Sequence, residues 1–550
     1  MQNIKITLLL IAIFILSNGL ALAGENYVKP KLILLIVADQ FAYNYLARFK
    51  SKFSKQGFNY LLNNGVYCAN CHYDHANLQT ACGHSIISTG AYPWATGIIA
   101  NQWFDRGKNV VTTSVNDASK QLVGSNGVGS SPHFLNSTTI GDELKLANRA
   151  SKVFSVSIKD RVAVLLAGRM ANLALYFDDN TGCFVSSTQY CTELPYYIKD
   201  YNEKHFVDNY LSQPWNRLLP EAEYASQSRS DDYFYEQGLT DDGKKFPHSV
   251  ATSNSKYKSF ASTPFANQAL TDLAKIIIDK EHLGQDDNCD LLCIGYSSGD
   301  YIGHNFGPYS QEMQDLVLRL DSNLNDLFKS VKASIGLENV LIVFTADHGV
   351  SPIPEYLSDL GLPGGRVDYK QITNSLNATL ASKLGKGEWI QAFEPPNLYL
   401  NLNTIDQNNV RQQDVEALVA NLTHNYKGVA EVFTASQFYN NKLPNSPYAK
   451  QARRSYYFGR SGELFVILKP GFIFSTINLG TNHGTPYSYD AQVPLLFAGN
   501  NLNNKVLFNR VSPADIAPTV LSRLGLEFTS QSEGNVIQLP LNEVFGPKNQ

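Results

Sequence analysis

Acidic and imidazole side chains that could bind metal ions occur at several well-separated points of the sequence. One pair is adjacent, Asp347 and His348, and a second pair, Asp300 and His304, lies four residues apart. A single pair would be weak evidence, because a buried aspartate often caps a helix and a lone histidine often packs in a core. The whole set, however, offers six oxygen and nitrogen ligands: Asp39, Asp300, His304, Asp347, His348 and His483. Six such ligands suffice for two metal ions with open coordination positions.

A hydroxyl nucleophile for such a centre is offered by Thr80. It begins the segment T-A-C-G-H-S, directly before a predicted helix at 85–89, and anions are favoured at helix N-termini. Contact with a metal ion would lower the pKa of the hydroxyl. The alternative is that Thr80 only caps the helix. Cys82 is a second candidate, but a thiol mechanism would need a histidine base and would leave the acidic residues without a role.

The elements that must position these side chains are apolar on both faces. Such runs are typical of strands buried in a parallel sheet, and three of them lead into Asp39, Asp300 and Asp347: 31–38, 290–296 and 339–346. Amphipathic helices are expected between them at 266–283 and 311–333. The alternation predicts an α/β fold with a doubly wound, mostly parallel sheet and helices on both faces. Ligands bind at the carboxyl ends of such strands, so the three aspartates point to one site.

Further segments complete the predicted organisation. Additional buried strands are expected at 153–157, 464–468 and 493–498. Two long excursions, at about 195–260 and 353–460, predict insertions, the second with a helix at 415–422. We expect a signal peptide at 1–23 and one catalytic domain with these insertions over 24–550.

The N-terminus and the composition bear on location and partners. Residues 1–23 combine one lysine, an apolar run at 6–16 and a small-x-small site at 21–23, as secretory signal peptides do. We therefore expect a periplasmic or secreted protein with no membrane anchor in the mature chain.

The sequence has 45 basic and 49 acidic residues, a charge of −4 that becomes −5 without Lys5. This balance argues against nucleic acid as the main partner, and 43% hydrophobic residues indicate a globular protein.

Cysteines and glycines suggest three other kinds of site. Close spacing in an oxidising compartment favours disulfides for Cys183 with Cys191 and for Cys289 with Cys293. The segment C-A-N-C-H at 68–72 matches the attachment motif of c-type haem, and its alternative is a half-buried strand. The glycines at 124–129 have P-loop spacing, but Ser130 stands where that loop needs a lysine, so a nucleotide-binding loop is rejected.

Six segments together resemble the alkaline phosphatase superfamily. They are, in order, Asp39 after a buried strand, T-A-C-G-H-S at 80–85, G-I-I-A-N-Q-W-F-D at 97–105, S-G-D-Y-I-G-H-N-F-G-P at 298–308, A-D-H-G at 346–349 and N-H-G-T at 482–485. Within it they are similar to the type I phosphodiesterase/nucleotide pyrophosphatase branch and, more closely, to bacterial phosphate-irrepressible alkaline phosphatases. The match spans about 30–525, and Cys82 departs from it, because many relatives have proline there.

The resemblance implies a role for each matched residue. One of two zinc ions would be held by Asp300, His304 and His483. The other would be held by Asp39, Asp347 and His348, with Thr80 as ligand and nucleophile. Asn101 would donate a hydrogen bond to a phosphate oxygen, and His84 would be structural.

The choice between monoesters and diesters rests on Lys159 and Arg161. If 157–161 is extended, both side chains share one face and can grip two phosphate oxygens; the alternative is an exposed basic turn. Phosphomonoesterases of this branch have such a pair. The positive charges of two divalent ions would balance the negative charges of three aspartates and an ionised Thr80. The positive charges of Lys159 and Arg161 would then remain, and they suit a dianionic substrate.

We therefore expect an exported, zinc-dependent alkaline phosphatase that hydrolyses small phosphate monoesters through a phosphothreonine intermediate. The first alternative is a nucleotide pyrophosphatase/phosphodiesterase on the same site. From other classes, a haem-bearing electron carrier and a non-catalytic phosphate or metal binder stay open. The oligomeric state is open as well, with a monomer favoured.

Overall fold

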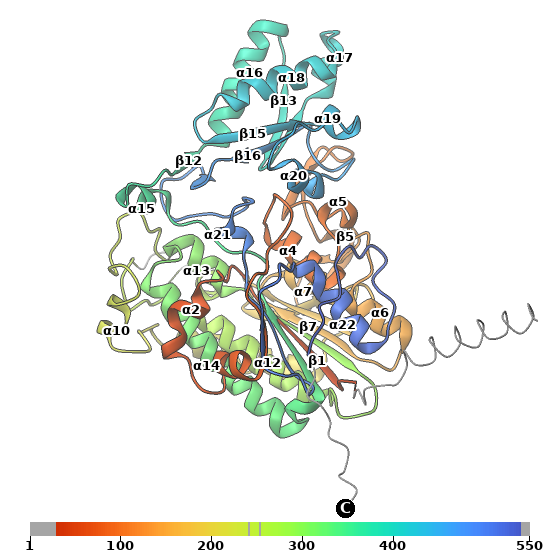
Figure 1. The fold of residues 1–550 in the computed structure, drawn as a ribbon, viewed down its shortest axis with the longest axis vertical. Coiled ribbons are helices and arrows are strands. Elements are labelled where there is room, and N and C mark those ends of the chain that lie inside the picture. The colour runs from red at the N-terminus through yellow and green to blue at the C-terminus, as the bar shows by residue number, and fades with distance from the viewer. Residues whose placement is uncertain (1–28, 240–242, 252, 254, 541–550) are drawn as a thin grey trace, which may run out of the picture.

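A computed structural model describes residues 29–239, 243–251, 253 and 255–540. The predicted signal peptide at 1–23 lies outside these residues. The described part divides into a large lower body and a smaller module at the top of Figure 1. Within it, no helix combines the length and apolar character needed to cross a membrane.

Five parallel strands form the centre of an 11-stranded sheet. In spatial order they are β11 (Val340–Thr345), β1 (Leu32–Ala38), β10 (Asp290–Tyr296), β7 (Val153–Ser157) and β8 (Leu173–Asp178). Every residue of these strands is buried, because helices cover both faces of a parallel sheet. The predicted strands at 31–38, 153–157, 290–296 and 339–346 are confirmed to within one residue at each end.

Further strands, some parallel and some antiparallel to their neighbours, extend the sheet at both edges. On one side β18 (Leu495–Gly499) runs antiparallel to β11 and is followed by β2 (Gly65–Cys68) and β19 (Lys505–Leu507). On the other side lie β9 (Cys183–Ser187), β5 (Asn116–Val123) and β6 (Val128–Ser130). The strand predicted at 493–498 is thus present as β18.

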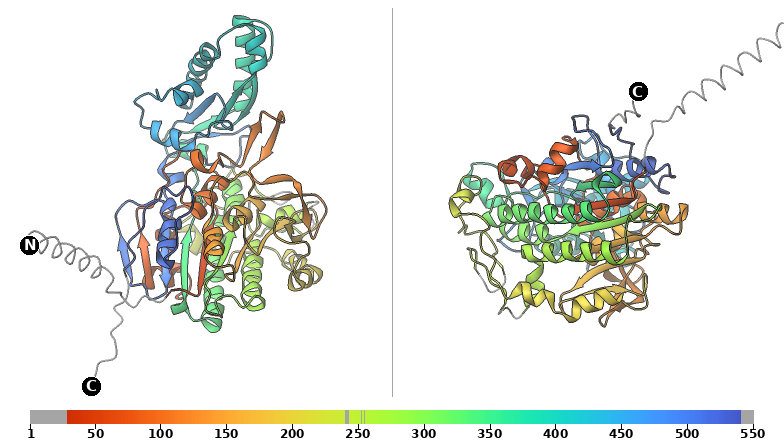
Figure 2. Two further views of the ribbon diagram at one scale, coloured as in Figure 1. Left: turned by 90° about the vertical axis from the view of Figure 1, so that its right-hand side faces the viewer. Right: turned by 90° about the horizontal axis from the view of Figure 1, so that it is seen from below.

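Helices cover the sheet on both faces, as the doubly wound fold requires. Helices α12 (Pro264–Lys280) and α14 (Gln311–Ser334) pack together on one face. On the other lie α4 (Thr80–Thr89), α7 (Asp160–Ala167) and α22 (Ile516–Leu524), as Figures 1 and 2 show. The helices predicted at 266–283 and 311–333 are confirmed.

Residues 365–474, called the insertion module below, build a second, four-stranded sheet. Its order is β13 (Ile390–Glu394), β14 (Asn397–Leu400), β16 (Leu464–Leu468) and β15 (Val429–Thr434). Helices α16 (Tyr369–Leu384) and α18 (Gln412–His424) complete it, and it has its own apolar core. The predicted strand at 464–468 and helix at 415–422 therefore exist, but they belong to this module and not to the main sheet.

All seven cysteines are free thiols, so the predicted disulfides are wrong. Cys293 lies within β10 and Cys289 directly before it. Four residues of extended chain span about 13 Å, which is too far for a disulfide.

The segment at 68–72 that matches the haem attachment motif forms part of the main sheet. Cys68 ends β2 and Cys71 forms a bridge to Val511. Both thiols are buried in the main core, as in the strand interpretation of this segment, and packed thiols leave no space for an attached porphyrin.

Candidate active site

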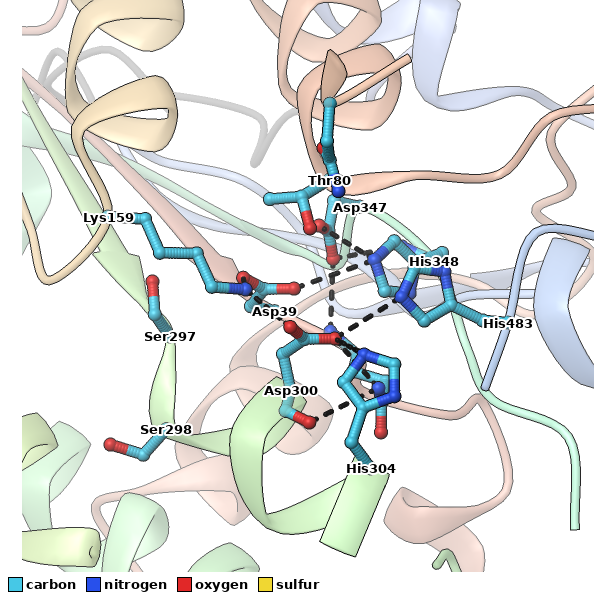
Figure 3. A network of polar contacts seen from close by, with 12 residues as sticks. Asp39, Thr80, Lys159, Ser297, Ser298, Asp300, His304, Asp347, His348 and His483 are labelled. Atoms are coloured by element: carbon cyan, nitrogen blue, oxygen red, sulfur yellow. Dashed lines mark hydrogen bonds and ion pairs between the residues drawn. The ribbon is translucent and has the colours of Figure 1, made fainter. Parts of the chain in front are cut away.

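Four neighbouring strands of the central sheet deliver charged side chains to one edge. Asp347 follows β11, Asp39 follows β1, and Lys159 follows β7. Between the last two, β10 leads into α13 (Ser298–Phe306), whose first turn carries Asp300. Because β11, β1, β10 and β7 are adjacent and parallel, three carboxylates and one ammonium meet at their carboxyl ends. Figure 3 shows this cluster.

The six predicted ligands all lie in this cluster. The structure places Asp300, His304 and His483 in one group of potential ligands and Asp39, Asp300 and His348 in another, with the ligand atoms of each group within 4.8 Å of one another. Asp300 thus takes part in both groups, whereas the sequence assigned it to one. Asp347 lies beside the second group, with its Oδ2 3.2 Å from His348 Nε2.

The three imidazoles are held with Nε2 pointing into the cluster. Their Nδ1 atoms contact backbone carbonyls: His304 to Thr481 at 2.9 Å, His348 to Gly349 at 2.9 Å and His483 to Leu78 at 2.6 Å. A carbonyl only accepts, so each Nδ1 carries a proton, and in the neutral ring Nε2 is the atom that offers a lone pair to a metal ion. This is the arrangement that fixes the tautomer of metal-binding histidines.

Several buried polar atoms of the cluster have no hydrogen-bond partner in the described structure. They are Asp39 Oδ1, Thr80 Oγ1, Asp347 Oδ2 and His348 Nε2. Burial, reinforced by Asp39, raises the pKa of Asp347 well above its usual range. Burial and the neighbouring His483 lower the pKa of His348. Buried carboxylates and imidazoles without partners are costly, and a divalent cation would satisfy both. The residues therefore fit a metal centre, and their oxygen and nitrogen donors suit zinc.

Thr80 is the first residue of α4, which begins five residues earlier than the sequence predicted. Gln79 occupies the N-cap position, so Thr80 is not the cap of this helix. The helix passes close to the end of β11 because residue 83 is glycine: a Cβ there would lie 2.3 Å from the carbonyl oxygen of Asp347. This close approach brings the unpartnered Thr80 hydroxyl to the cluster (Figure 3).

Two more residues of the Thr80 neighbourhood have defined places. Asn101 Oδ1 accepts a hydrogen bond from the backbone N–H of Ala81 at 2.9 Å, which leaves its amide nitrogen free to donate into the cavity that it lines. His84 is enclosed and contacts the Thr80 carbonyl through Nδ1 at 2.8 Å. Burial lowers the pKa of His84 to about 4.

The extended stretch considered for 157–161, which would put Lys159 and Arg161 on one face, is not formed. Strand β7 ends at Ser157, and α7 begins at Asp160, so the turn into the helix replaces the period of two. Lys159 is buried, with its Nζ 2.6 Å from Asp39 Oδ2 and 2.5 Å from Asp300 Oδ2. Burial alone would lower the pKa of Lys159, but the two carboxylates raise it. Arg161 instead lines the open cavity, and its buried Nε has no hydrogen-bond partner.

Gln40 is a site residue that the sequence did not reveal. Its backbone N–H donates to Asp347 Oδ1 at 3.0 Å, and its Nε2 donates to Asp300 Oδ1 at 2.7 Å. It reaches both through a left-handed backbone, with φ of 61°. In the sequence, the only indication that Gln40 belongs to the site is its position next to Asp39.

A cavity of about 460 Å³ opens beside the cluster. One end holds Asn101, Arg161 and the ligand group of Asp300, His304 and His483. The other end is formed by residues of the insertion module: Tyr369, Glu394, Pro395, Pro396 and Phe474. The sequence analysis did not predict these five lining residues either, because no motif contains them and only the tertiary structure brings them to the site.

Comparison with known proteins gives a consistent result. A family model described as type I phosphodiesterase/nucleotide pyrophosphatase matches residues 33–488. The chain is 35% identical over 548 residues to alkaline phosphatase PafA of Elizabethkingia meningoseptica, covering 98% of each sequence. It is 36% identical over 533 residues to alkaline phosphatase PhoV of Synechococcus elongatus, covering 93% of each.

A solved structure agrees with the sequence relatives. The crystal structure of wild-type alkaline phosphatase PafA matches with a TM-score of 0.89 and 33% identity, over 95% of this chain and 100% of that one. The predicted α/β fold is thereby confirmed.

Proposed function

The chain belongs to the type I phosphodiesterase/nucleotide pyrophosphatase family of the alkaline phosphatase superfamily, and we propose that within it the protein is an exported, zinc-dependent phosphomonoesterase. The relatives named above support a hydrolase that acts on phosphate esters. The observation that carries the finer proposal is the unpartnered Thr80 hydroxyl, buried beside two groups of potential metal ligands.

Two zinc ions would be held by the residues at the strand ends. His304, His483 and Asp300 would hold one, and Asp39, Asp347 and His348 would hold the other together with Thr80. When bound, the ions supply positive charge that lowers the pKa of the Thr80 hydroxyl and stabilises the departing oxygen.

Thr80 is the proposed nucleophile. Its deprotonated oxygen attacks phosphorus in line with the ester bond, which breaks to release the alcohol and leaves phosphothreonine. Water then attacks the same phosphorus, releasing inorganic phosphate and restoring Thr80. Its position in the first turn of α4 supports this role, since helix N-termini favour the charge of a phosphoryl group.

The remaining proposed contacts orient the phosphoryl group. Asn101 would donate from its free amide nitrogen, and Arg161 from the guanidinium that lines the cavity. Two of the Lys159 donors are engaged by Asp39 and Asp300, which leaves a third N–H for a phosphate oxygen. With both basic side chains the site suits a dianionic monoester.

The substrate class can be tested with two aryl esters. We expect faster hydrolysis of an aryl phosphate than of its methyl phosphodiester, measured as kcat/KM under the same conditions. A preference for the diester would contradict the monoesterase proposal and favour a nucleotide pyrophosphatase/phosphodiesterase, which the description of the matching family model includes.

Export is a separate part of the proposal. It rests on the predicted signal peptide at 1–23, and fractionation of cells that express the full chain would test it. Recovery of uncleaved protein from the cytoplasm alone would contradict it.

A further inference from the structure

We propose that Glu394, Tyr369 and Phe474 form a leaving-group subsite that favours phosphate monoesters carrying a positively charged ammonium. Phosphocholine and phosphoethanolamine represent this chemical class. The proposal rests on the monoesterase function above and adds a preference that the strand-end residues alone do not determine.

Amide side chains hold the insertion module against the active site. Gln102, next to Asn101, donates from Nε2 to a carboxylate oxygen of Glu394 at 2.7 Å. Gln79, which directly precedes the proposed nucleophile, donates from Nε2 to the carbonyl of Pro395 at 3.1 Å. The Oε1 of Gln79 also accepts the backbone N–H of Asn101 at 2.8 Å. The Glu394 carboxylate is therefore tied to residues adjacent to those that would contact the phosphoryl group.

A third amide ties an aromatic wall to the metal-ligand side of the cavity. Asn482, directly before His483, donates from Nδ2 to the carbonyl of Phe474 at 3.1 Å. Behind this wall the buried Phe393 packs edge-on against both rings that line the cavity, with centroid distances of 5.9 Å to Tyr369 and 5.7 Å to Phe474. The two rings are thus supported from within the insertion module.

The Glu394 carboxylate accepts a hydrogen bond but forms no salt bridge among the described residues. Within the described parts of the chain no lysine, arginine or histidine forms a salt bridge with Glu394, and its hydrogen bond comes from a neutral amide. Glu394 and Tyr369 line the same cavity, and the Tyr369 ring packs against Phe393, the residue directly before Glu394.

The cavity therefore has two chemically different ends. The phosphoryl end carries Arg161 and the proposed cations, whereas the insertion end carries one carboxylate and two aromatic rings. A carboxylate attracts an ammonium, and aromatic faces bind cations, most effectively quaternary ammonium groups. A leaving group with additional phosphates would instead be repelled by Glu394.

The test compares two substrates of equal shape and different charge. Phosphocholine and 3,3-dimethylbutyl phosphate differ only in the quaternary nitrogen, which is carbon in the neutral ester. The readout is the ratio of their kcat/KM values on one enzyme sample, because losses of folded or metal-loaded protein cancel in the ratio.

For the wild-type enzyme we expect a ratio of about 5 in favour of phosphocholine, the combined size of an exposed ion pair and a cation–π contact. Glu394→Gln keeps an oxygen acceptor for Gln102 but removes the charge, so its ratio should fall to about 2, the part that the aromatic rings retain. Glu388→Gln makes the same charge change at an exposed position of the insertion module away from the cavity lining, and it should keep the wild-type ratio. Tyr369→Leu should lower the ratio by about half through loss of one ring.

An equal ratio in the wild-type enzyme and Glu394→Gln would overturn the subsite while leaving the monoesterase function intact. A fall of the same size in Glu388→Gln would also overturn it, because the effect would then be one of overall charge. Failure of the wild-type enzyme to hydrolyse any monoester, an aryl phosphate included, would overturn both proposals.

Discussion

The buried ion pairs of Lys159 give a stability prediction that can be compared with an exposed pair of the same length. The Lys159 side chain is 1% exposed, and its ammonium bridges Asp39 and Asp300. Lys159→Met keeps the length of the side chain but leaves both carboxylates without this partner. Removing one member of a buried ion pair costs about 3–5 kcal/mol, so we expect a loss of unfolding free energy of this size.

Lys204 provides the matched control. Its Nζ lies 2.6 Å from Asp200, the same distance as between Lys159 and Asp39, but the Lys204 side chain is 57% exposed. Lys204→Met should therefore cost less than about 1 kcal/mol. The assay is urea unfolding of both variants in chelator, where bound cations cannot compensate the carboxylates. Equal midpoints for the two variants would refute the argument, because burial of the pair would then have no energetic consequence.

Three further predictions concern chemistry, metal and pH. Thr80→Ala should abolish turnover while metal analysis still finds the bound ions, and an active variant would exclude Thr80 as nucleophile. Chelation should remove activity and added Zn²⁺ should restore it, whereas activity indifferent to chelator would contradict the metal centre. Burial lowers the pKa of His75 to about 3. Below about pH 6.5 the unfolded imidazole therefore binds a proton that the folded one does not, and stability falls by up to about 1.4 kcal/mol per pH unit. His75→Phe should show a shallower loss between pH 6.5 and 3 in urea titrations; an unchanged slope would mean that His75 is not the group responsible.

Four of the five central parallel strands, all except β8, could be predicted because burial on both faces leaves a simple pattern. Strands β1 and β11, which precede Asp39 and Asp347, contain only apolar residues and one threonine, and a strand in a parallel sheet delivers the residues after it to the ligand edge. The six potential ligands could be found for the same reason. The place of Asp300 in both groups could not, because it depends on the neighbouring strands and on the turn into α13.

Other features depend on local geometry that the sequence pattern does not record. The stretch from Ser157 to Arg161 reads equally well as strand or turn, and the start of α7 at Asp160 decides where Lys159 points. The cysteine pairs looked close in sequence, but extended chain separates Cys289 from Cys293. Spacing along a chain predicts contact only when the backbone conformation is known.

The way in which the insertion module is attached explains how it can contribute specificity without disturbing the charge of the active site. Arginine side chains also tie the module to the main body, but beside the cavity three of the hydrogen bonds come from the amides of Gln79, Gln102 and Asn482, which are neutral. A lysine or arginine in the place of Gln102 would hold Glu394 more strongly, but it would also cancel the negative charge and compete for the phosphoryl group. An amide fixes the carboxylate and leaves its charge available. Gln102→Lys should therefore lower the preference for phosphocholine over its neutral isostere to about that of Glu394→Gln, even though Glu394 is still present.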